Sequence, residues 1–163
     1  MNKPTDSSPR GIYAEKNYGF LYLSGVDTDL HEKYLLQFEG NTASAFIVGM
    51  VSDSIGNVYI YGNCSNEITY SNKQVPRGVF LAKHDPARNL LWICSIANAE
   101  ATTDIGEKMA MDPTHEFIYL TGTFYEEISI PGGGTLAPEG QGSIFVMKFD
   151  GEGHFIWLQR IEN

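Results

Sequence analysis

The chain has 163 residues, 42% of them hydrophobic and 12% aromatic, which is enough apolar material for one folded domain with a sizeable core. Its 20 acidic and 11 basic side chains give a formal net charge of −9, which would repel the phosphates of nucleic acid and an anionic membrane surface. We therefore expect no nucleic-acid partner. We also expect no membrane insertion, because no apolar stretch approaches the roughly 18 residues of a membrane span.

The first ten residues differ in composition from the rest of the chain. Residues 1–10 (MNKPTDSSPR) are rich in Pro, Ser and charged residues and lack an apolar run, so we expect a disordered leader and not a signal peptide. Further along, Cys64 and Cys94 are too few for a disulfide framework. We interpret both as ordinary buried or edge thiols that give no indication of the redox compartment.

A strand-rich segment then occurs three times. Residues 11–25 (GIYAEKNYGFLYLSG), 51–62 (VSDSIGNVYIYG) and 110–122 (AMDPTHEFIYLTG) each combine a short strand, an acidic turn and a run of Tyr, Phe, Val or Ile that ends at Gly. This composition predicts two strands joined by a turn. Within the middle copy, Tyr59 and Tyr61 are interpreted as core residues in preference to an aromatic platform for a ligand.

A second segment occurs twice. Residues 79–96 (VFLAKHDPARNLLWICSI) align without a gap with residues 144–161 (IFVMKFDGEGHFIWLQRI), and the Lys, Asp and Trp positions coincide. Each copy predicts an antiparallel pair around a tight turn, with Gly153 or Asn89 in the left-handed conformation. The predicted pairs are 79–84 with 90–96 and 144–149 with 155–161.

The first copy of the repeat is shorter than the others. Residues 34–38 (YLLQF) align with residues 80–84, but little sequence separates them from the next copy. Residues 45–51 then fit two interpretations. They form a fourth strand of the first copy, with Phe46 in the place of Trp92, or they form the first strand of the second copy.

About four strands in about 60 residues, repeated along a chain, is typical of a β-propeller blade. Near-continuous apolar runs such as residues 79–82 indicate strands that are covered on both faces. We predict an all-β fold of repeated four-stranded antiparallel blades. Since propellers need at least about four blades to close, the arc is predicted to be partial and open. The predicted single domain spans residues 11–163, in units of about 11–45, 46–104 and 105–163.

The chain resembles the bacterial SBBP-type β-propeller repeat in residues 53–62 (DSIGNVYIYG), 80–92 (FLAKHDPARNLLW) and 127–157 (EISIPGGGTLAPEGQGSIFVMKFDGEGHFIW). It departs from that pattern in its short first copy and at Arg88, where the family usually has Gly. The resemblance implies four-stranded blades and a mostly extracellular or cell-surface setting. It implies no shared catalytic residues.

No motif predicts catalysis, a cofactor or a metal site. The glycines at 132–134 are not followed by the Lys-Ser/Thr of a phosphate loop. An acidic cluster lacks the glycine and the terminal glutamate of a calcium loop, so we interpret it as a solvated turn; it comprises Asp27, Asp29, His31 and Glu32. Three histidines fall at turn positions and are interpreted as exposed: His84, His115 and His154.

Two kinds of loop contain the candidates for a ligand site: the loop that joins predicted blades, at residues 97–107, and the long loops between second and third strands, at residues 64–77 and 124–142. They combine acidic side chains with aromatic ones, a combination that suits a cationic or sugar-like ligand better than an anion. The candidates are Glu100, Asp104, Glu107, Tyr70, Phe124 and Tyr125.

Three functional hypotheses follow from the sequence. The first is a non-enzymatic module for protein interaction or cell-surface scaffolding, whose exposed end blades associate with a second copy or with further blades. The second is a carbohydrate- or small-ligand-binding propeller that uses the loop aromatics and acidic residues. The third is a hydrolase or lyase with its site in the axial channel, although the sequence offers no nucleophile–base pair for it.

Overall fold

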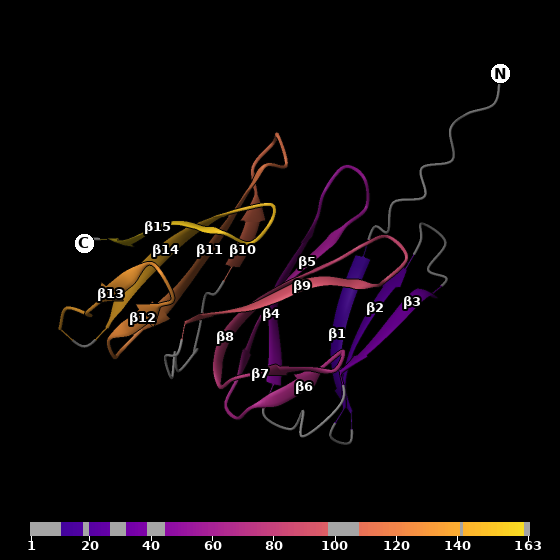
Figure 1. Cartoon of the computed structure of the whole chain (residues 1–163), viewed down its shortest axis with the longest axis horizontal. Coiled ribbons are helices and arrows are strands. Elements are labelled where there is room, and N and C mark those ends of the chain that lie inside the picture. Colours follow the sequence, from indigo (N-terminus) through magenta and orange to yellow (C-terminus); the bar gives the residue numbers. More distant parts are fainter. Residues whose placement is uncertain are drawn as a thin grey trace.

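The computed structural model describes residues 11–17, 20–26, 32–38, 45–97, 108–140 and 142–161, and its regular structure is entirely β. The strands form three antiparallel sheets, which we call the first, middle and third sheets in chain order (Figure 1). The first sheet contains β1 (Gly11–Asn17), β2 (Phe20–Val26) and β3 (Glu32–Phe38). The middle sheet contains β4 (Ala45–Ser52), β5 (Val58–Cys64), β8 (Gly78–His84) and β9 (Leu90–Ala97). The third sheet contains β10 (Lys108–Met111), β11 (Phe117–Phe124), β14 (Ser143–Asp150) and β15 (Phe155–Ile161).

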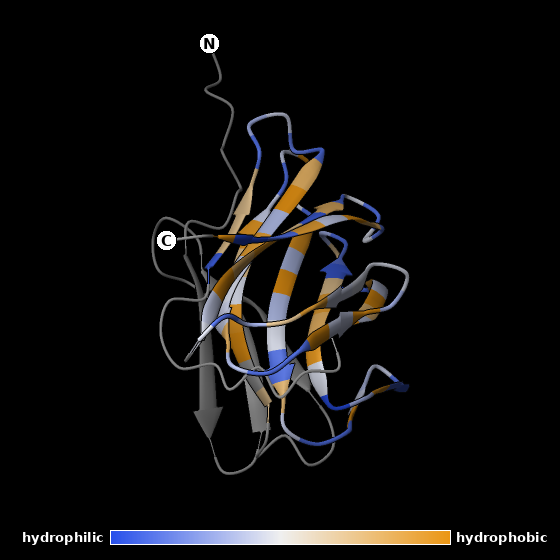
Figure 2. Ribbon diagram, turned by 90° about the vertical axis from the view of Figure 1, so that its left-hand side faces the viewer, coloured by the Kyte–Doolittle hydropathy of each residue, from blue (hydrophilic) through white to orange (hydrophobic). Residues whose placement is uncertain are grey.

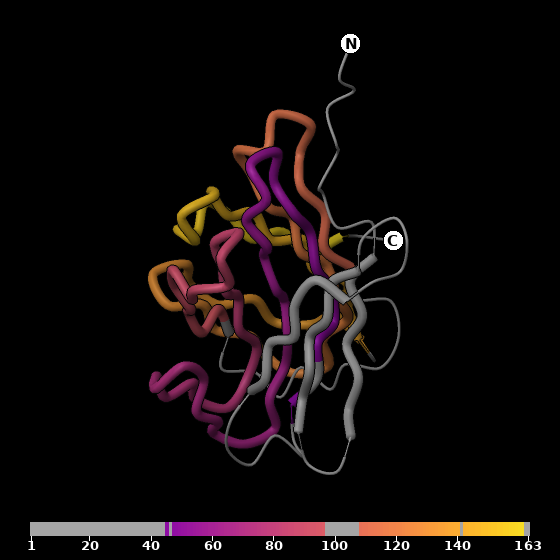
Figure 3. Tube along the Cα trace, turned by 90° about the vertical axis from the view of Figure 1, so that its right-hand side faces the viewer, coloured from indigo at the N-terminus to yellow at the C-terminus, as the bar shows by residue number. Residues whose placement is uncertain are grey.

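Each four-stranded sheet also carries a small hairpin between its second and third strands. These hairpins pair β6 (Ile68–Tyr70) with β7 (Lys73–Val75) and β12 (Ile128–Ile130) with β13 (Gly134–Leu136). Both project to the same side of the molecule (Figure 3). The sequence predicted long loops between the second and third strands here. The structure corrects that expectation, because alternate side chains of β6 and β12 are buried.

The strand pairs predicted from the second repeated segment are confirmed. β8 pairs with β9 and β14 with β15, both antiparallel. The alternative left open at residues 45–51 is also resolved, since β4 pairs with β5 and therefore belongs to the middle sheet. One turn residue was predicted wrongly. Arg88, with φ 76°, takes the left-handed position that Gly153 occupies in the other copy, and not Asn89.

An aspartate organises each of the four tight turns that join the first to the second strand and the third to the fourth strand of the two four-stranded sheets. Its carboxylate accepts hydrogen bonds from backbone amides later in the turn; the four residues are Asp53, Asp85, Asp112 and Asp150. At Asp112, hydrogen bonds from the Thr114 side chain and from the amide of Phe117 lower the pKa of the carboxyl to about 2. The acidic turns of the repeat therefore have a structural role.

The middle sheet lies between the other two sheets (Figure 1). One of its faces packs on the third sheet, with Tyr59 and Leu81 against Ile118 and Phe145. The opposite face forms a second apolar cluster around Phe80, which also includes buried residues of β6 and β7. Every residue of β8 is consequently buried, as the continuous apolar run predicted.

The described residues cover the third sheet on one face only. Buried residues alternate with partly exposed ones along β11 and β14. Figure 2 shows the same alternation as a change of hydropathy along the strands. In the described part of the chain no helix is long and apolar enough to cross a membrane.

The first strands of the middle and third sheets, β4 and β10, are edge strands of their sheets and lie side by side (Figure 1). Their approach is close at Gly49, where an added Cβ would lie 2.7 Å from the Cβ of Met109 and 3.3 Å from its backbone nitrogen. Only a residue without a side chain fits this contact.

We expect Gly49→Ala to lower the free energy of unfolding by about 1–3 kcal/mol, because the new methyl group would force β4 and β10 apart. Ser52→Ala, an exposed position on the same strand, is the control and should cost less than about 0.5 kcal/mol. Equal losses for the two variants in urea denaturation would contradict the close contact.

Candidate functional site

The middle and third sheets carry the same row of three side chains. In the middle sheet the strand register places Tyr59 opposite Lys83 and Lys83 opposite Trp92. In the third sheet it places Tyr119 opposite Lys148 and Lys148 opposite Trp157. We call these the filled row and the open row, because only the first is covered by another part of the chain that the structure describes.

The tyrosine and tryptophan rings of the two rows have nearly the same relative geometry. The ring centroids of Tyr59 and Trp92 lie 6.1 Å apart at an interplanar angle of 61°. Those of Tyr119 and Trp157 lie 6.2 Å apart at 59°. In both sheets the strand register places the lysine between the tyrosine and the tryptophan. The repeat therefore preserves a three-dimensional arrangement as well as a sequence pattern.

The turn between β14 and β15 covers the filled row. The amine of Lys83 donates to the carbonyl oxygen of Gly151 and to Oε1 of Glu152, both at 2.9 Å. The hydroxyl of Tyr59 lies 3.3 Å from the same carbonyl oxygen and 3.4 Å from Oδ2 of Asp53. Because that hydroxyl has one proton, it donates to one of these acceptors at a time.

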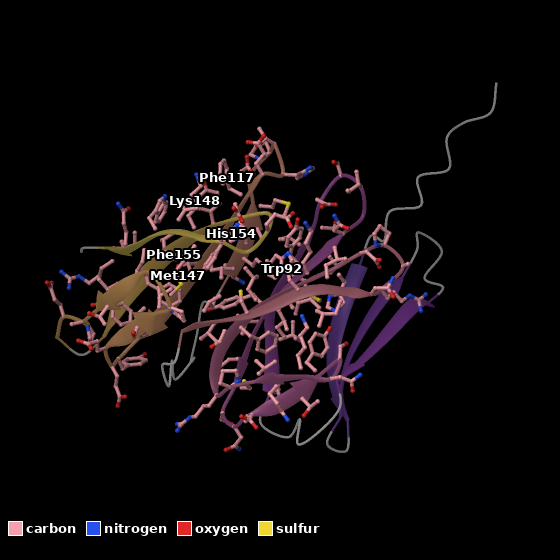
Figure 4. The ribbon with its side chains drawn as sticks, viewed as in Figure 1. Trp92, Phe117, Met147, Lys148, His154 and Phe155 are labelled. Carbon is pink, nitrogen blue, oxygen red and sulfur yellow. The ribbon has the colours of Figure 1, made fainter. Side chains whose placement is uncertain are left out.

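Glycine allows the turn to approach the row closely. A Cβ at Gly153 would lie 2.9 Å from the indole ring of Trp92, and the φ angle of Gly153 is +82°. A side chain here would therefore clash with the ring and strain the backbone at once. Figure 4 shows Trp92 on the middle sheet, near His154 of the covering turn.

Lys83 remains charged although its side chain is only 8% exposed. Burial by itself would lower the pKa of the Lys83 amine, but the hydrogen bonds and charges of Glu152 and Tyr59 outweigh burial and raise it. Burial raises the pKa of Tyr59. In the filled row, the charged amine of Lys83 therefore binds a backbone carbonyl and a carboxylate of the covering turn, between Tyr59 and Trp92 in the strand register.

The open row presents the same groups on the other side of the third sheet. The amine of Lys148 lies 3.6 Å from the ring centroid of Phe117 and 5.4 Å from that of Tyr119. It makes no hydrogen bond or ion pair with the residues that the structure describes. Figure 4 places Lys148 and Phe117 together on the side of the third sheet away from Trp92.

The face around the open row is partly apolar and partly polar. Ile144 and Ile161, which pair across β14 and β15, are 44% and 47% exposed. At the positions that correspond to Tyr61 and Cys94 of the buried face, the third sheet has Thr121 and Gln159. We call this surface the open face of the third sheet.

A shallow pocket of about 410 Å³ lies at the opposite end of the open face from Lys148. Its lining residues are Thr123, Glu139, Gly142, Ser143, Ile144, Arg160 and Ile161. Arg160 forms an ion pair with Glu139, whose backbone amide donates to Oγ of Ser143 at 2.8 Å. The exposed ring of Tyr125 packs beside Gly142.

The structure separates the ligand-site candidates predicted from the sequence. Tyr125 is 47% exposed and remains available for a ligand. Tyr70 and Phe124 were predicted wrongly as loop aromatics, since both are core residues. Tyr70 is the last residue of β6 and is buried, and Phe124 packs on Phe145 at the end of β11. The acidic candidates lie outside the described residues: Glu100, Asp104 and Glu107.

His84 was also predicted wrongly as an exposed turn histidine. It is 1% exposed at the end of β8, where its Nε2 is hydrogen-bonded to the hydroxyl of Tyr70. Burial lowers the pKa of His84 to about 4, although the charge of Asp85 acts in the opposite direction. The prediction of exposure is correct for His115 and His154.

Neither cysteine is activated for chemistry. Burial raises the pKa of Cys94 to about 11 and also raises that of Cys64. Within the described ranges, no group of His, Cys, Asp and Glu side chains has the geometry of a metal site. Three members of the acidic cluster, Asp27, Asp29 and His31, lie outside those ranges.

No family model and no curated protein matches the chain.

We expect Lys83→Met to lower the free energy of unfolding by about 2–3 kcal/mol, because it removes charge-assisted hydrogen bonds and leaves the Gly151 carbonyl without the amine. Lys148→Met is the matched control and should cost less than about 1 kcal/mol, the value of an exposed cation–π contact. Equal losses in urea denaturation would show that the covering turn does not depend on Lys83.

Stability should decrease as the pH falls from 7 to 5. Unfolding raises the pKa of His84 from about 4 to its ordinary value near 6.5, so the unfolded chain takes up the proton first. The resulting loss is about 2 kcal/mol by pH 5 and grows toward pH 4. Urea denaturation at each pH measures it.

The control for this pH dependence is the double variant His84→Phe/Tyr70→Phe. Phe149 occupies the position equivalent to His84 in the third sheet, so this position of the repeat accepts a phenyl ring. The double variant should lose little stability between pH 7 and 5. If it loses as much as the wild-type chain, His84 is not the group responsible.

Proposed function

We propose that the chain is a non-enzymatic β-propeller module that acts by association through its end sheets, either with a second copy or with further blades. In this proposal each four-stranded sheet is a blade and the chain forms an open arc. The stacking of the middle and third sheets supports it, as does the contact between their first strands, β4 and β10.

One observation carries the proposal. The same face is buried in the middle sheet and uncovered in the third. Val79 and Ile96 of the middle sheet are each 2% exposed, whereas the equivalent residues Ile144 and Ile161 are 44% and 47% exposed. Apolar side chains exposed in a sheet geometry that elsewhere in the chain packs on another sheet are typical of an interaction surface.

Carbohydrate binding is a second candidate function. The exposed ring of Tyr125 lies beside the pocket that Glu139, Ser143 and Arg160 line, and sugars are commonly held by an aromatic face together with polar side chains. A glycan array with the wild-type chain and Tyr125→Ala tests it. Loss of a glycan signal in the variant would favour this function. Nothing in the described residues favours the hydrolase or lyase hypothesis, and we do not propose it.

Sedimentation equilibrium tests the proposed association. We expect a species of twice 18.1 kDa or larger at tens of micromolar. Ile161→Ser should weaken it, because it removes apolar area from the open face. Leu91→Ser is the matched control, since Leu91 is also 47% exposed but belongs to the middle sheet. A wild-type chain that remains at 18.1 kDa, or equal effects of both variants, would contradict the proposal.

A further inference from the structure

The middle sheet buries a polar pair at a place where the third sheet buries an apolar one. His84 is the last residue of β8 and Tyr70 the last of β6, and Nε2 of the histidine is hydrogen-bonded to the tyrosine hydroxyl. The two rings meet edge to face, with their centroids 5.5 Å apart. Phe149 and Ile130 occupy the equivalent positions of the third sheet and are also buried. The repeat therefore folds without the polar pair, so the fold itself does not require it.

The buried imidazole has no acceptor for a second proton. Nδ1 of His84 is buried and has no hydrogen-bond partner among the described residues. A protonated imidazole carries an N–H on both nitrogens, so Nδ1 would become an unpaired donor on a buried cation. A buried charge of this kind is strongly destabilised unless it reaches water.

The charged residues beside His84 do not compensate for such a proton. Asp85 favours the protonated form through its charge. Its carboxylate already accepts hydrogen bonds from the backbone amide and the side chain of Asn89, at 2.8 and 2.7 Å. Lys83 directs its amine to the turn at residues 150–154 and adds a like charge next to the imidazole in the chain.

The other described groups around the imidazole are neutral. Burial raises the pKa of the Tyr70 hydroxyl and of the Cys64 thiol, the titratable groups that β6 and β5 contribute to the same apolar cluster. The residues opposite His84 on the neighbouring strands are Val58 and Leu90, which are apolar. Burial consequently lowers the pKa of His84 to about 4.

The hairpin that carries Tyr70 is weakly built. Its strands β6 and β7 have three residues each, and its two turn residues, Ser71 and Asn72, have φ angles of 46° and 63° without being glycine. A two-stranded hairpin is at best marginally stable by itself, so this one depends on the burial of Ile68, Tyr70 and Val75. An element held by so few side chains opens at a lower free energy than the whole domain.

We propose that the His84–Tyr70 pair is an acid-sensitive switch: when His84 takes up a proton, the hairpin β6–β7 leaves the middle sheet while the large sheets remain folded. Removal of Tyr70 gives the charged imidazole access to water. It also uncovers Cys64, which belongs to the same apolar cluster as the hairpin and whose Sγ lies 3.3 Å from the carbonyl oxygen of Pro76, just after β7. This inference does not depend on the proposed association.

The Cys64 thiol reports the opening directly. The wild-type chain is labelled with N-ethylmaleimide between pH 7 and pH 5, and peptide mass spectrometry distinguishes Cys64 from Cys94. Each rate is divided by the rate for the urea-unfolded chain at the same pH, which cancels the pH dependence of the thiol itself. The normalised rate of Cys64 should rise about twentyfold from pH 7 to pH 5, because His84 regains its ordinary pKa near 6.5 in the open state.

Two comparisons separate local opening from general unfolding. Below the unfolding transition, the rate of Cys64 at pH 5 should depend little on urea, because a local opening exposes little surface. The double variant His84→Phe/Tyr70→Phe, shown to be folded by circular dichroism, should label at a normalised rate that changes less than about twofold over the same pH range.

Three results would overturn the inference. A normalised rate of Cys64 that does not rise on acidification would show that the hairpin stays closed over a charged imidazole. A rise whose urea dependence is as steep as that of global unfolding would show that the whole domain opens. A rise of the same size in the double variant would show that another group is responsible.

Discussion

The contact between Lys83 and the turn at residues 150–154 is the constraint that joins the middle and third sheets. A sheet with an apolar face needs a second layer, and apolar packing alone does not fix how two layers are aligned. The lysine amine supplies that alignment, because it reaches a carbonyl and a carboxylate only when the turn lies directly over the row. The tight approach at Gly153 then follows, as does the contact of Gly49 with Met109 at the opposite edge of the stacked sheets.

The two faces of the third sheet have different roles although they belong to the same strands. The buried face carries Phe145, Met147 and Phe149, each 1% exposed, and is as dry as a protein core. The open face alternates isoleucine with threonine and glutamine around a cation on an aromatic ring. Such a surface is compatible with water and also resembles the buried face of the middle sheet. A surface that tolerates water and also resembles a buried face is suited to an interaction through end sheets. The same repeat pattern can therefore form a core in the middle sheet and an exposed surface in the third sheet.

The sequence predicted the strands and their pairing well, because the repeat aligned Lys, Asp and Trp in two copies and their spacing allows only one hairpin geometry. It predicted the ligand-site residues poorly. Tyr70 lies in β6, and a three-residue strand leaves almost no periodicity to detect. Phe124 lies at the end of β11, because the alternation of that strand continues past Gly122, where the strand was predicted to end. His84 was mistaken for a turn residue because its partner Tyr70 is distant in sequence. The conserved spacing of Tyr, Lys and Trp was visible in the sequence, whereas the fact that only one row is covered required the structure.

A double-mutant cycle between Lys83→Met and Gly153→Ala tests the central role of the turn contact most directly. Each variant should displace the same turn, the first by removing the amine and the second by a clash 2.9 Å from the Trp92 ring. The free energies of unfolding from urea denaturation should therefore be non-additive, with the double variant losing about as much as the more damaging single variant. Losses that add to within about 0.5 kcal/mol would show that the two residues act independently and would contradict the account.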